Sequence, residues 1–213
     1  MQFQDLIYEI RNGVAWIIIN RPDKMNAFRG TTCDELIKAL YKAGYDKSVG
    51  AIVLAGAGDR AFCTGGDQSA HDGDYDGRGT IGLPMEELHA AIRDVPKPVI
   101  ARVQGFAIGG GNVLATICDL TICSDKAVFG QVGPKMGWVD PGYGTAFLSR
   151  VVGERGVPRA LSEQRQVVCV GRSKRRPKRR LGRKVAHSRG PTRTRRRRAA
   201  YSGPLPMLAA SPQ

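Results

Sequence analysis

The stretch GFAIGGGNVLATICDLTICS, residues 105–124, decides the fold. It begins with a short apolar segment that runs into three consecutive glycines, and we expect a helix over residues 110–117 followed by a strand over residues 120–123. Glycine lets backbone N–H groups approach a ligand without obstruction from a Cβ atom. At the start of a helix these groups also lie at the positive end of the helix dipole. The stretch therefore combines α/β element order with a candidate binding turn.

A second glycine-rich turn, AFCTGGDQ at residues 61–68, also directly follows an apolar segment. Two such turns facing each other would form an oxyanion hole, a pair of backbone N–H groups that stabilises negative charge on an oxygen. Either turn alone is more often just a tight bend in the chain. The loop over residues 65–82 favours a binding or lid role, because connections of this length are uncommon in compact domains.

The remaining segments of residues 1–154 alternate between strand and helix patterns. Apolar runs typical of strands occur at residues 6–10, 14–20, 51–55 and 99–103. The first two runs flank Asn12-Gly13, a dipeptide that suits a tight hairpin turn. The third is apolar throughout, as in a strand that is buried on both faces. This alternation indicates an α/β fold.

Further helices are expected at residues 85–94 and 144–152, and one more precedes the first buried strand. Thr31 or Thr32 is expected to cap that helix with its hydroxyl, and the helix is expected to end near Gly44. Asp34 and Glu35 would lie in its first turn, where the helix dipole favours negative charge.

The charge of the chain is divided between two segments. Residues 1–154 carry 15 Lys and Arg and 18 Asp and Glu, a net charge of −3, whereas residues 155–213 carry 18 basic residues and one acid, a net charge of +17. The second segment has recurrent prolines and no apolar periodicity, so we expect a folded domain at 1–154 followed by a disordered, Arg-rich tail. The composition of this tail also fits an out-of-frame reading of GC-rich DNA, and we hypothesise a frameshift near codon 154.

Five cysteines without a Cys-x-x-Cys pair indicate buried reduced thiols, and neither a disulfide framework nor a zinc site. His71 and His89 have no ligand partner at helical spacing, so both are predicted to be surface histidines. No apolar run reaches the roughly 18 residues of a membrane span, and the first residues lack a signal-peptide pattern. We therefore expect a cytoplasmic protein with no metal, no cofactor and no membrane contact.

Four motifs in order, RPDKMNAF, AFCTGGDQ, GFAIGGGNVLATICDLTICS and FGQVGPKMGWVDPGYGT, closely resemble the crotonase (enoyl-CoA hydratase/isomerase) superfamily over about residues 1–154. The resemblance implies a spiral of ββα units and coenzyme A thioester substrates, with coenzyme A as part of the substrate. It also implies an oxyanion hole formed by the N–H groups of Gly66 and Gly110. Family members form homo-trimers or hexamers through C-terminal helices. Those helices are missing from the pattern of this chain, so its assembly is left open.

The same resemblance implies a set of substrate and coenzyme A contacts. Along the coenzyme A moiety these are Lys24, Met25, Ala27 and Arg29. The other contacts are Thr64, Gly65, Asp67, Gln68, Phe106, Ile108, Gly109, Val132 and Gly133, together with Tyr75, which would cover the substrate.

Departures from the family pattern indicate a subgroup. Hydratases of this family carry glutamates where this chain has Val113 and Gly133, so the acid and base that add water to an enoyl double bond are missing. The motifs GGDQ and FGQxGPKxGxxD resemble instead the dihydroxynaphthoyl-CoA synthase branch. Within that branch, residues 1–40 look most like the 2-ketocyclohexanecarboxyl-CoA hydrolases, the ring-opening enzymes of anaerobic benzoate degradation.

Ring opening of a β-keto thioester requires hydroxide to add to the ketone, and the following C–C cleavage leaves a thioester enolate. Gly66 and Gly110 would hold the enolate oxygen, and Asp140 would orient or deprotonate the water. The branch has a serine at the position of Trp138, whose indole could fill the acyl pocket. Three alternatives stay open: ring closure as in the dihydroxynaphthoyl-CoA synthases, an inactive remnant, and a polyanion-binding protein. The tail lacks interleaved aromatic residues, so specific nucleic-acid recognition is not expected.

Overall fold

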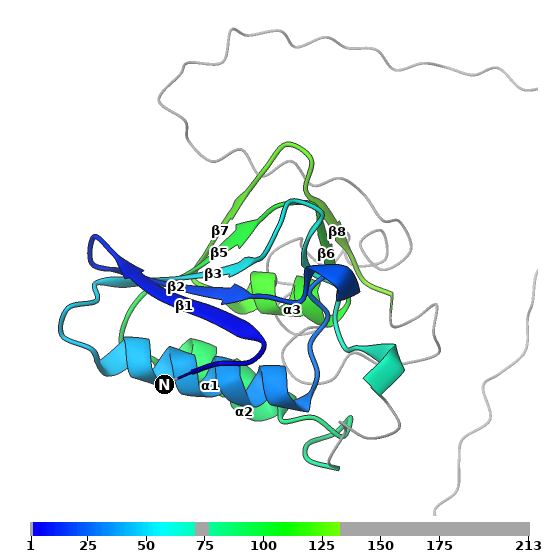
Figure 1. Ribbon diagram of the computed structural model, residues 1–213, viewed down its shortest axis with the longest axis horizontal. Coiled ribbons are helices and arrows are strands. Elements are labelled where there is room, and N and C mark those ends of the chain that lie inside the picture. Colours follow the sequence, from blue (N-terminus) through cyan, green and yellow to red (C-terminus); the bar gives the residue numbers. More distant parts are fainter. Residues whose placement is uncertain (1, 71–76, 133–213) are drawn as a thin grey trace, which may run out of the picture. The chain divides into compact units, whose positions relative to one another are not determined.

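The computed structural model describes residues 2–70 and 77–132, which contain two β-sheets (Figure 1). The larger sheet has the strand order β1-β2-β3-β5-β7 and the smaller one the order β4-β6-β8. The strands of the larger sheet are β1 (Leu6–Arg11), β2 (Val14–Ile19), β3 (Ala51–Gly56), β5 (Val99–Val103) and β7 (Leu120–Cys123). Those of the smaller sheet are β4 (Ala61–Cys63), β6 (Phe106–Ile108) and β8 (Val128–Gly130).

The hairpin at the N-terminal edge confirms the turn expected at Asn12-Gly13. Strands β1 and β2 pair antiparallel, from Leu6 opposite Ile19 to Arg11 opposite Val14. Asn12 and Gly13 have φ angles of 52° and 75°, the left-handed values that a two-residue hairpin turn of this type needs. All other strand pairs within the two sheets are parallel.

The parallel strands follow a repeated ββα order. Strand β3 lies in the larger sheet, β4 in the smaller one, and α2 (Met85–Asp94) follows; β5, β6 and α3 (Gly110–Ile117) repeat this order, and β7 and β8 begin it again. This order confirms the expected spiral of ββα units, and α2 and α3 have the predicted bounds. The three strands of the smaller sheet were not predicted as separate elements, because three residues are too few to show an apolar period.

Helix α1 (Gly30–Tyr45) begins earlier than predicted. Its N-cap is Arg29, and neither Thr31 nor Thr32 holds that position. The Thr32 hydroxyl accepts a hydrogen bond from the Arg29 backbone N–H over 3.2 Å, so it satisfies the cap from within the first turn.

The two acidic residues expected in the first turn of α1 lie beyond it. Asp34 accepts two 2.9 Å hydrogen bonds from the guanidinium of Arg78. Glu35 accepts hydrogen bonds from the backbone N–H groups of Gln4 and Asp5, over 2.7 and 2.8 Å. These carboxylates therefore bind distant segments and do not complement the helix dipole.

The hydrophobic core lies between the larger sheet and the helices α1 and α2, which run along one of its faces (Figure 1). Helix α3 packs against β4, β5 and β6, so it contacts strands of both sheets. Fully burying an aliphatic side chain stabilises a fold by about 1.5–3 kcal/mol. Those buried here include Ile17, Ile19, Leu36, Leu40, Ile52, Leu54, Leu88 and Leu114.

His89 on α2 corrects the prediction of a surface histidine. Its exposure is only 2%, and burial lowers the pKa of its imidazole to about 4. The apolar pattern of this helix did not show whether position 89 is on the buried or the exposed face, because the next two residues are both alanine.

The described cysteines fit the expected reduced thiols. Cys33, Cys63 and Cys118 are buried and Cys123 is half-buried, all without a disulfide. Burial raises the pKa of Cys63 and of Cys118 to about 12. These thiols are therefore protonated at neutral pH and inert as nucleophiles.

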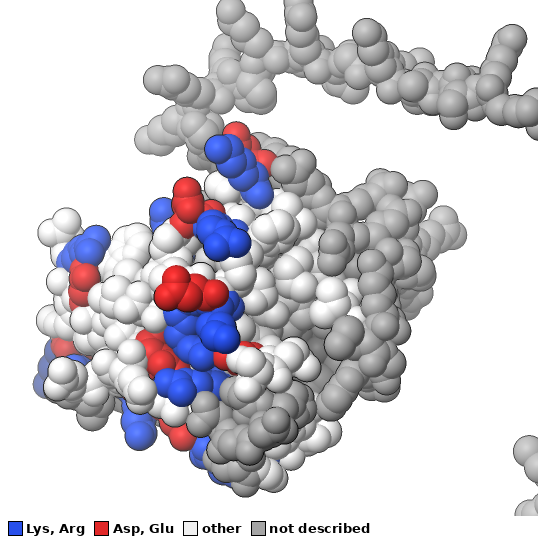
Figure 2. Space-filling view, turned by 45° about the vertical axis from the view of Figure 1, so that its right-hand side comes forward, with Lys and Arg blue, Asp and Glu red and all other residues white. Residues whose placement is uncertain are grey.

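The surface of the described part carries charges of both signs. On the face shown in Figure 2, acidic and basic side chains lie next to one another and form no extended patch of one sign. No helix among the described residues is long and apolar enough to cross a membrane. The helix expected at 144–152, the boundary at 154, the tail, His71 and Cys169 lie outside the described residues.

Candidate active site

The two glycine-rich turns meet. Strands β4 and β6 are parallel neighbours, so the turns that follow them leave from the same edge of the smaller sheet. A Cβ atom built on Gly65 would lie 3.1 Å from the backbone nitrogen of Gly110, and one built on Gly110 would lie 3.4 Å from the Cα of Gly65. Gly65 also has a φ of 88°. Glycine is needed at this contact for space and for backbone conformation.

Gly66 is held against Phe28 in an isolated parallel bridge. The N–H of Phe28 donates to the carbonyl of Gly65 over 2.9 Å, and the N–H of Asp67 donates to the carbonyl of Phe28 over 2.8 Å. In a parallel bridge of this kind the intervening residue directs its own N–H away from the partner. Within the described residues, the Gly66 N–H donates no backbone hydrogen bond.

Gly110 supplies a second N–H because it is the first residue of α3. The first N–H groups of a helix have no acceptor inside it and lie at the positive end of its dipole. Its neighbour Gly109 has a φ of 55° and donates its N–H to the carbonyl of Gly130 over 2.9 Å, which ties the turn to β8. The two turns thus present backbone donors with the chemistry that an oxyanion requires.

The loop that contains RPDKMNAF lies along the first glycine turn. Lys24 ends the short helix η1 (Pro22–Lys24), and its Nζ donates to the hydroxyl of Ser69 over 3.2 Å. The carbonyl of Met25 accepts a 3.3 Å hydrogen bond from the hydroxyl of Thr64. Of the predicted coenzyme A contacts, Met25 is therefore hydrogen-bonded to the predicted contact Thr64, and Lys24 to Ser69, which directly follows Gln68. Ala27 precedes Phe28, which pairs with the glycine turn.

Asn26 was not among the predicted site residues, and it anchors this loop. Its side chain is 1% exposed, and its Nδ2 donates to the carbonyls of Ala57 and Ala61 over 2.9 and 2.8 Å. Its Oδ1 accepts the backbone N–H of Arg21, and its φ is 56°, a value that asparagine tolerates well. The asparagine of the RPDKMNAF motif was the signal for this role.

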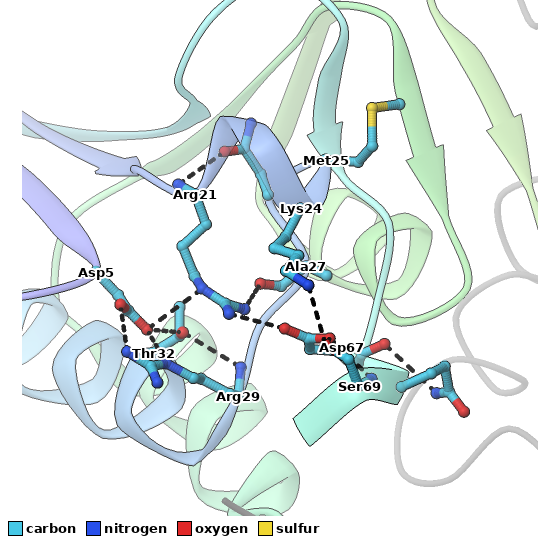
Figure 3. Close-up of polar contacts among 12 residues, drawn as sticks. Asp5, Arg21, Lys24, Met25, Ala27, Arg29, Thr32, Asp67 and Ser69 are labelled. Atoms are coloured by element: carbon cyan, nitrogen blue, oxygen red, sulfur yellow. Dashed lines mark hydrogen bonds and ion pairs between the residues drawn. The ribbon is translucent and has the colours of Figure 1, made fainter. Parts of the chain in front are cut away.

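A partly buried ionic network connects the loop to the glycine turn, as Figure 3 shows. Arg21 lies between Asp67, which accepts from its Nη2 over 2.7 Å, and Asp5, whose carboxylate is 3.8 Å from its Nε. The Nη1 of Arg21 donates to the carbonyl of Ala27 over 2.5 Å. Arg21 and Asp5 were not predicted; Arg21 lies in the quoted motif, whereas Asp5 stands in a segment without a signal.

Both carboxylates of this network are ionised at neutral pH. Burial opposes ionisation of Asp67, but hydrogen bonds from Ser69 and Arg21 outweigh it and lower the pKa. Burial likewise opposes ionisation of Asp5, but hydrogen bonds from Arg29 and Thr32 lower its pKa. The network therefore pairs two negative with two positive side chains.

Arg29 directs its guanidinium toward Asp5, with hydrogen bonds of 2.9 and 3.0 Å to the two carboxylate oxygens. Its contact with coenzyme A stays a prediction. Gln68 begins the short helix η2 (Gln68–Ala70), is exposed, and donates from Nε2 to the carbonyl of Gly66 over 3.4 Å.

The remaining described residues of the predicted set lie around β6 and α3. Ile108 ends β6 beside the glycine turn, and Val132 lies against Gly109, 3.5 Å from the position of an added Cβ. Phe106 is at the other end of β6 and is 42% exposed. Val113, which stands where hydratases carry a glutamate, is buried on α3.

Four predicted site residues lie outside the described residues: Tyr75, Gly133, Trp138 and Asp140. Among the described residues, no three His, Cys, Asp or Glu side chains form a group that could hold a metal ion.

The parallel ββα repeat and the paired glycine turns define an α/β protein with backbone donors at the edge of a small sheet. A model of the enoyl-CoA hydratase/isomerase family matches residues 9–168, and the chain belongs to this family. The matched residues run past position 154, the expected end of the folded domain. The family predicted from the four motifs is thereby confirmed, whereas the branch within it stays a prediction.

Solved structures of similar proteins support the same fold. One is described as a putative enoyl-CoA hydratase/isomerase from Legionella pneumophila; it is 32% identical, with a TM-score of 0.67, over 77% of this chain and 64% of that one. An enoyl-CoA hydratase/carnithine racemase from Magnetospirillum magneticum is 28% identical, with a TM-score of 0.69, over 77% and 62%. An enoyl-CoA hydratase from Mycobacterium avium subsp. paratuberculosis is 28% identical, with a TM-score of 0.68, over 78% and 66%. The chain thus spans less than two thirds of the length of these proteins.

Proposed function

We propose that this protein acts on an acyl-CoA thioester and stabilises the enolate of that thioester with the N–H groups of Gly66 and Gly110. The observation that carries the proposal is the contact between the two glycine turns. Gly65 touches the first residue of α3, while the bridge to Phe28 leaves the Gly66 N–H free of the strand pairing. Two similar proteins are named as enoyl-CoA hydratases, and these names support an acyl-CoA thioester as the substrate class.

The reaction that we propose is hydrolytic ring opening of 2-ketocyclohexanecarboxyl-CoA to pimelyl-CoA. Hydroxide adds to the ring ketone, the bond between that carbon and the α-carbon breaks, and its electron pair forms the thioester enolate. A proton then adds to the α-carbon, and the water oxygen remains in the new carboxylate. Asp140 is assigned to the water by resemblance. The buried Val113 supports a reaction other than hydration, since it offers no carboxylate.

The oxyanion role is tested by removing one donor. Gly66→Pro deletes the N–H, and Gly66→Ala keeps it, so the pair separates the hydrogen bond from the bulk of a side chain. We expect kcat of the proline variant to fall by about 10²–10³ relative to the alanine variant, as for other oxyanion-hole donors. Circular dichroism and thermal unfolding check that both variants are folded. Equal kcat values for the two folded variants would contradict the assignment.

The substrate is tested with the full chain and 2-ketocyclohexanecarboxyl-CoA in ¹⁸O-labelled water. Mass spectrometry should detect pimelyl-CoA with one labelled oxygen in its free carboxylate. A Trp138→Ser variant, which restores the residue of the resembled branch, is assayed in parallel and should turn over faster. Absence of product from both forms would exclude this substrate, and kcat of the Gly66 variants would then be compared on other acyl-CoA thioesters.

A further inference from the structure

We propose that Arg21 and Asp67 are positioning residues whose largely buried ion pair holds the Gly66 N–H in place beside the Gly110 N–H. The proposal rests on the proposed function of these two donors. Neither side chain needs to touch the substrate for this role, because both act through the backbone that carries Gly66.

The hydrogen bonds of Arg21 and Asp67 connect the two segments of the bridge between Phe28 and Gly66. Asp67 directly follows Gly66, and its backbone N–H donates to the carbonyl of Phe28. Its carboxylate accepts from Nη2 of Arg21 over 2.7 Å, and Nη1 of the same guanidinium donates to the carbonyl of Ala27 over 2.5 Å. One planar group therefore joins the residue after Gly66 to the residue before Phe28 (Figure 3). The bridge cannot slide without breaking one of these hydrogen bonds.

Phe28 transmits this restraint to the second donor. Its side chain is 1% exposed, and a Cβ atom built on Gly110 would lie 2.6 Å from its Cζ atom. The backbone of Phe28 holds the Gly66 turn, and its ring packs against the start of α3. A displacement of Phe28 changes the separation of the two N–H groups, and a misplacement of about 1 Å in a catalytic site can cost about 10²-fold in rate.

The burial of Arg21 and Asp67 is better explained by a role in positioning the Gly66 turn than by a contribution to the free energy of unfolding. The side chains of Arg21 and Asp67 are 13% and 7% exposed. Removing two charges from water costs about as much free energy as their attraction returns, so a buried ion pair is weak evidence for a stabilising role. Asp67 also accepts hydrogen bonds from the N–H and hydroxyl of Ser69 over 3.0 and 2.6 Å. Its two oxygens thus face donors on both sides.

Asp67→Asn tests the proposal with almost no change of size. The amide has only one acceptor oxygen and no charge, so it cannot accept from both Arg21 and Ser69, and any hydrogen bond that it keeps with Arg21 is weaker than that of the carboxylate. We expect kcat to fall by about tenfold to a hundredfold with KM changed by less than about twofold, since the lost interaction matters mainly in the transition state.

A spectroscopic measurement separates positioning from folding. Acetoacetyl-CoA is a β-keto thioester whose enolate absorbs in the ultraviolet. Bound to the full chain, it should ionise at a lower pH than in solution because the two N–H groups stabilise the enolate. In Asp67→Asn the apparent pKa of the bound probe should return toward its solution value by about one unit, the shift that a tenfold weaker enolate stabilisation produces.

Asp46→Asn is the matched control. The carboxylate of Asp46 accepts hydrogen bonds from the N–H and hydroxyl of Ser48 over 2.8 and 2.6 Å, the same local motif as that of Asp67 and Ser69. It lies at the C-terminal end of α1 and makes no hydrogen bond to an arginine among the described residues. We expect its kcat and the pKa of its bound probe to equal those of the wild type.

Arg21→Lys keeps the charge and provides a second variant if Asp67→Asn does not fold. Lysine cannot bridge two acceptors with the fixed geometry of a guanidinium, so the same effects are expected at smaller size. Wild-type kcat and probe pKa in either folded variant would overturn the positioning role. A wild-type chain that neither turns over thioester nor ionises the probe would contradict the proposed function itself, and the positioning role with it.

Discussion

His89 shows how burial changes the behaviour of a single residue. It lies within α2 at 2% exposure, and desolvation lowers the pKa of its imidazole from 6.5 to about 4, although the nearby Glu86 opposes the shift. The unfolded chain therefore binds a proton on this side chain at a higher pH than the folded chain does.

We predict that the free energy of unfolding falls as the pH is lowered from 6.5 toward 4, because the unfolded state is then the more protonated one. Between these two pH values, the lowered pKa of His89 reduces the free energy of unfolding by about 3 kcal/mol. Urea unfolding at several pH values between 7.5 and 4.5 measures it. In His89→Leu this part of the pH dependence should be absent, and an unchanged slope would show that other groups cause it.

The carboxylates of Asp5 and Asp67 act at lower pH. Hydrogen bonds hold both of their pKa values below the ordinary value, so their contribution to stability is complete above that value and is lost as the pH falls through the folded-state pKa. The effect of His89 is therefore observed at a higher pH than theirs.

Gly105 illustrates a requirement at the scale of elements, since it connects β5 in the larger sheet to β6 in the smaller one. Its φ is 60°, and a Cβ atom there would lie 1.9 Å from the carbonyl oxygen of Arg60. Gly58 also has a positive φ, 74°, but no atom lies within 4 Å of an added Cβ. Both positions have a left-handed backbone conformation, but only Gly105 lacks room for a Cβ atom.

We predict that Gly105→Ala lowers the free energy of unfolding much more than Gly58→Ala. The Gly58 variant should lose about 1 kcal/mol, the usual cost of a left-handed conformation. The Gly105 variant should lose at least about 3 kcal/mol, because the backbone of β6 must also move. Urea denaturation compares them, and equal losses would contradict a steric role of this crossover.

The predictability of an element depended on its length and on its local capping groups. Helices α2 and α3 were predicted with their observed bounds because each follows a proline or glycine turn. The predicted N-cap of α1 was wrong by two or three residues, since the cap hydrogen bond of Thr32 runs from inside the helix. The three-residue strands of the smaller sheet carry too little pattern and become strands only when they pair with each other.

The charge of the whole molecule is concentrated in one segment. Residues 155–213 carry a net charge of +17, whereas residues 1–154 carry −3. The described residues show both signs on the face in Figure 2. An Arg-rich segment binds polyanions mainly by releasing counterions, and this attraction is strongly salt-dependent.

We predict that the full chain binds unrelated single-stranded DNA oligomers of equal length with equal affinity, and that the affinity falls steeply with salt concentration. Filter binding at several salt concentrations measures both properties. A clear preference for one sequence that persists at high salt would favour a nucleic-acid function over nonspecific attraction. Thioester turnover at saturating DNA serves as the companion assay and should be unchanged.

The sequence by itself determined the family, through the resemblance of its four motifs, and that resemblance implied the ββα order. Local pattern located the two glycine turns, because glycine motifs that follow apolar runs report local backbone geometry. The sequence also led to Gly66 and Gly110, which lie 44 residues apart in the chain. Only the tertiary structure decided that Asp5, Arg21 and Asp67 share one network and that His89 is buried. Such contacts depend on how distant segments are brought into register by the sheets, and no local pattern of residues specifies that register.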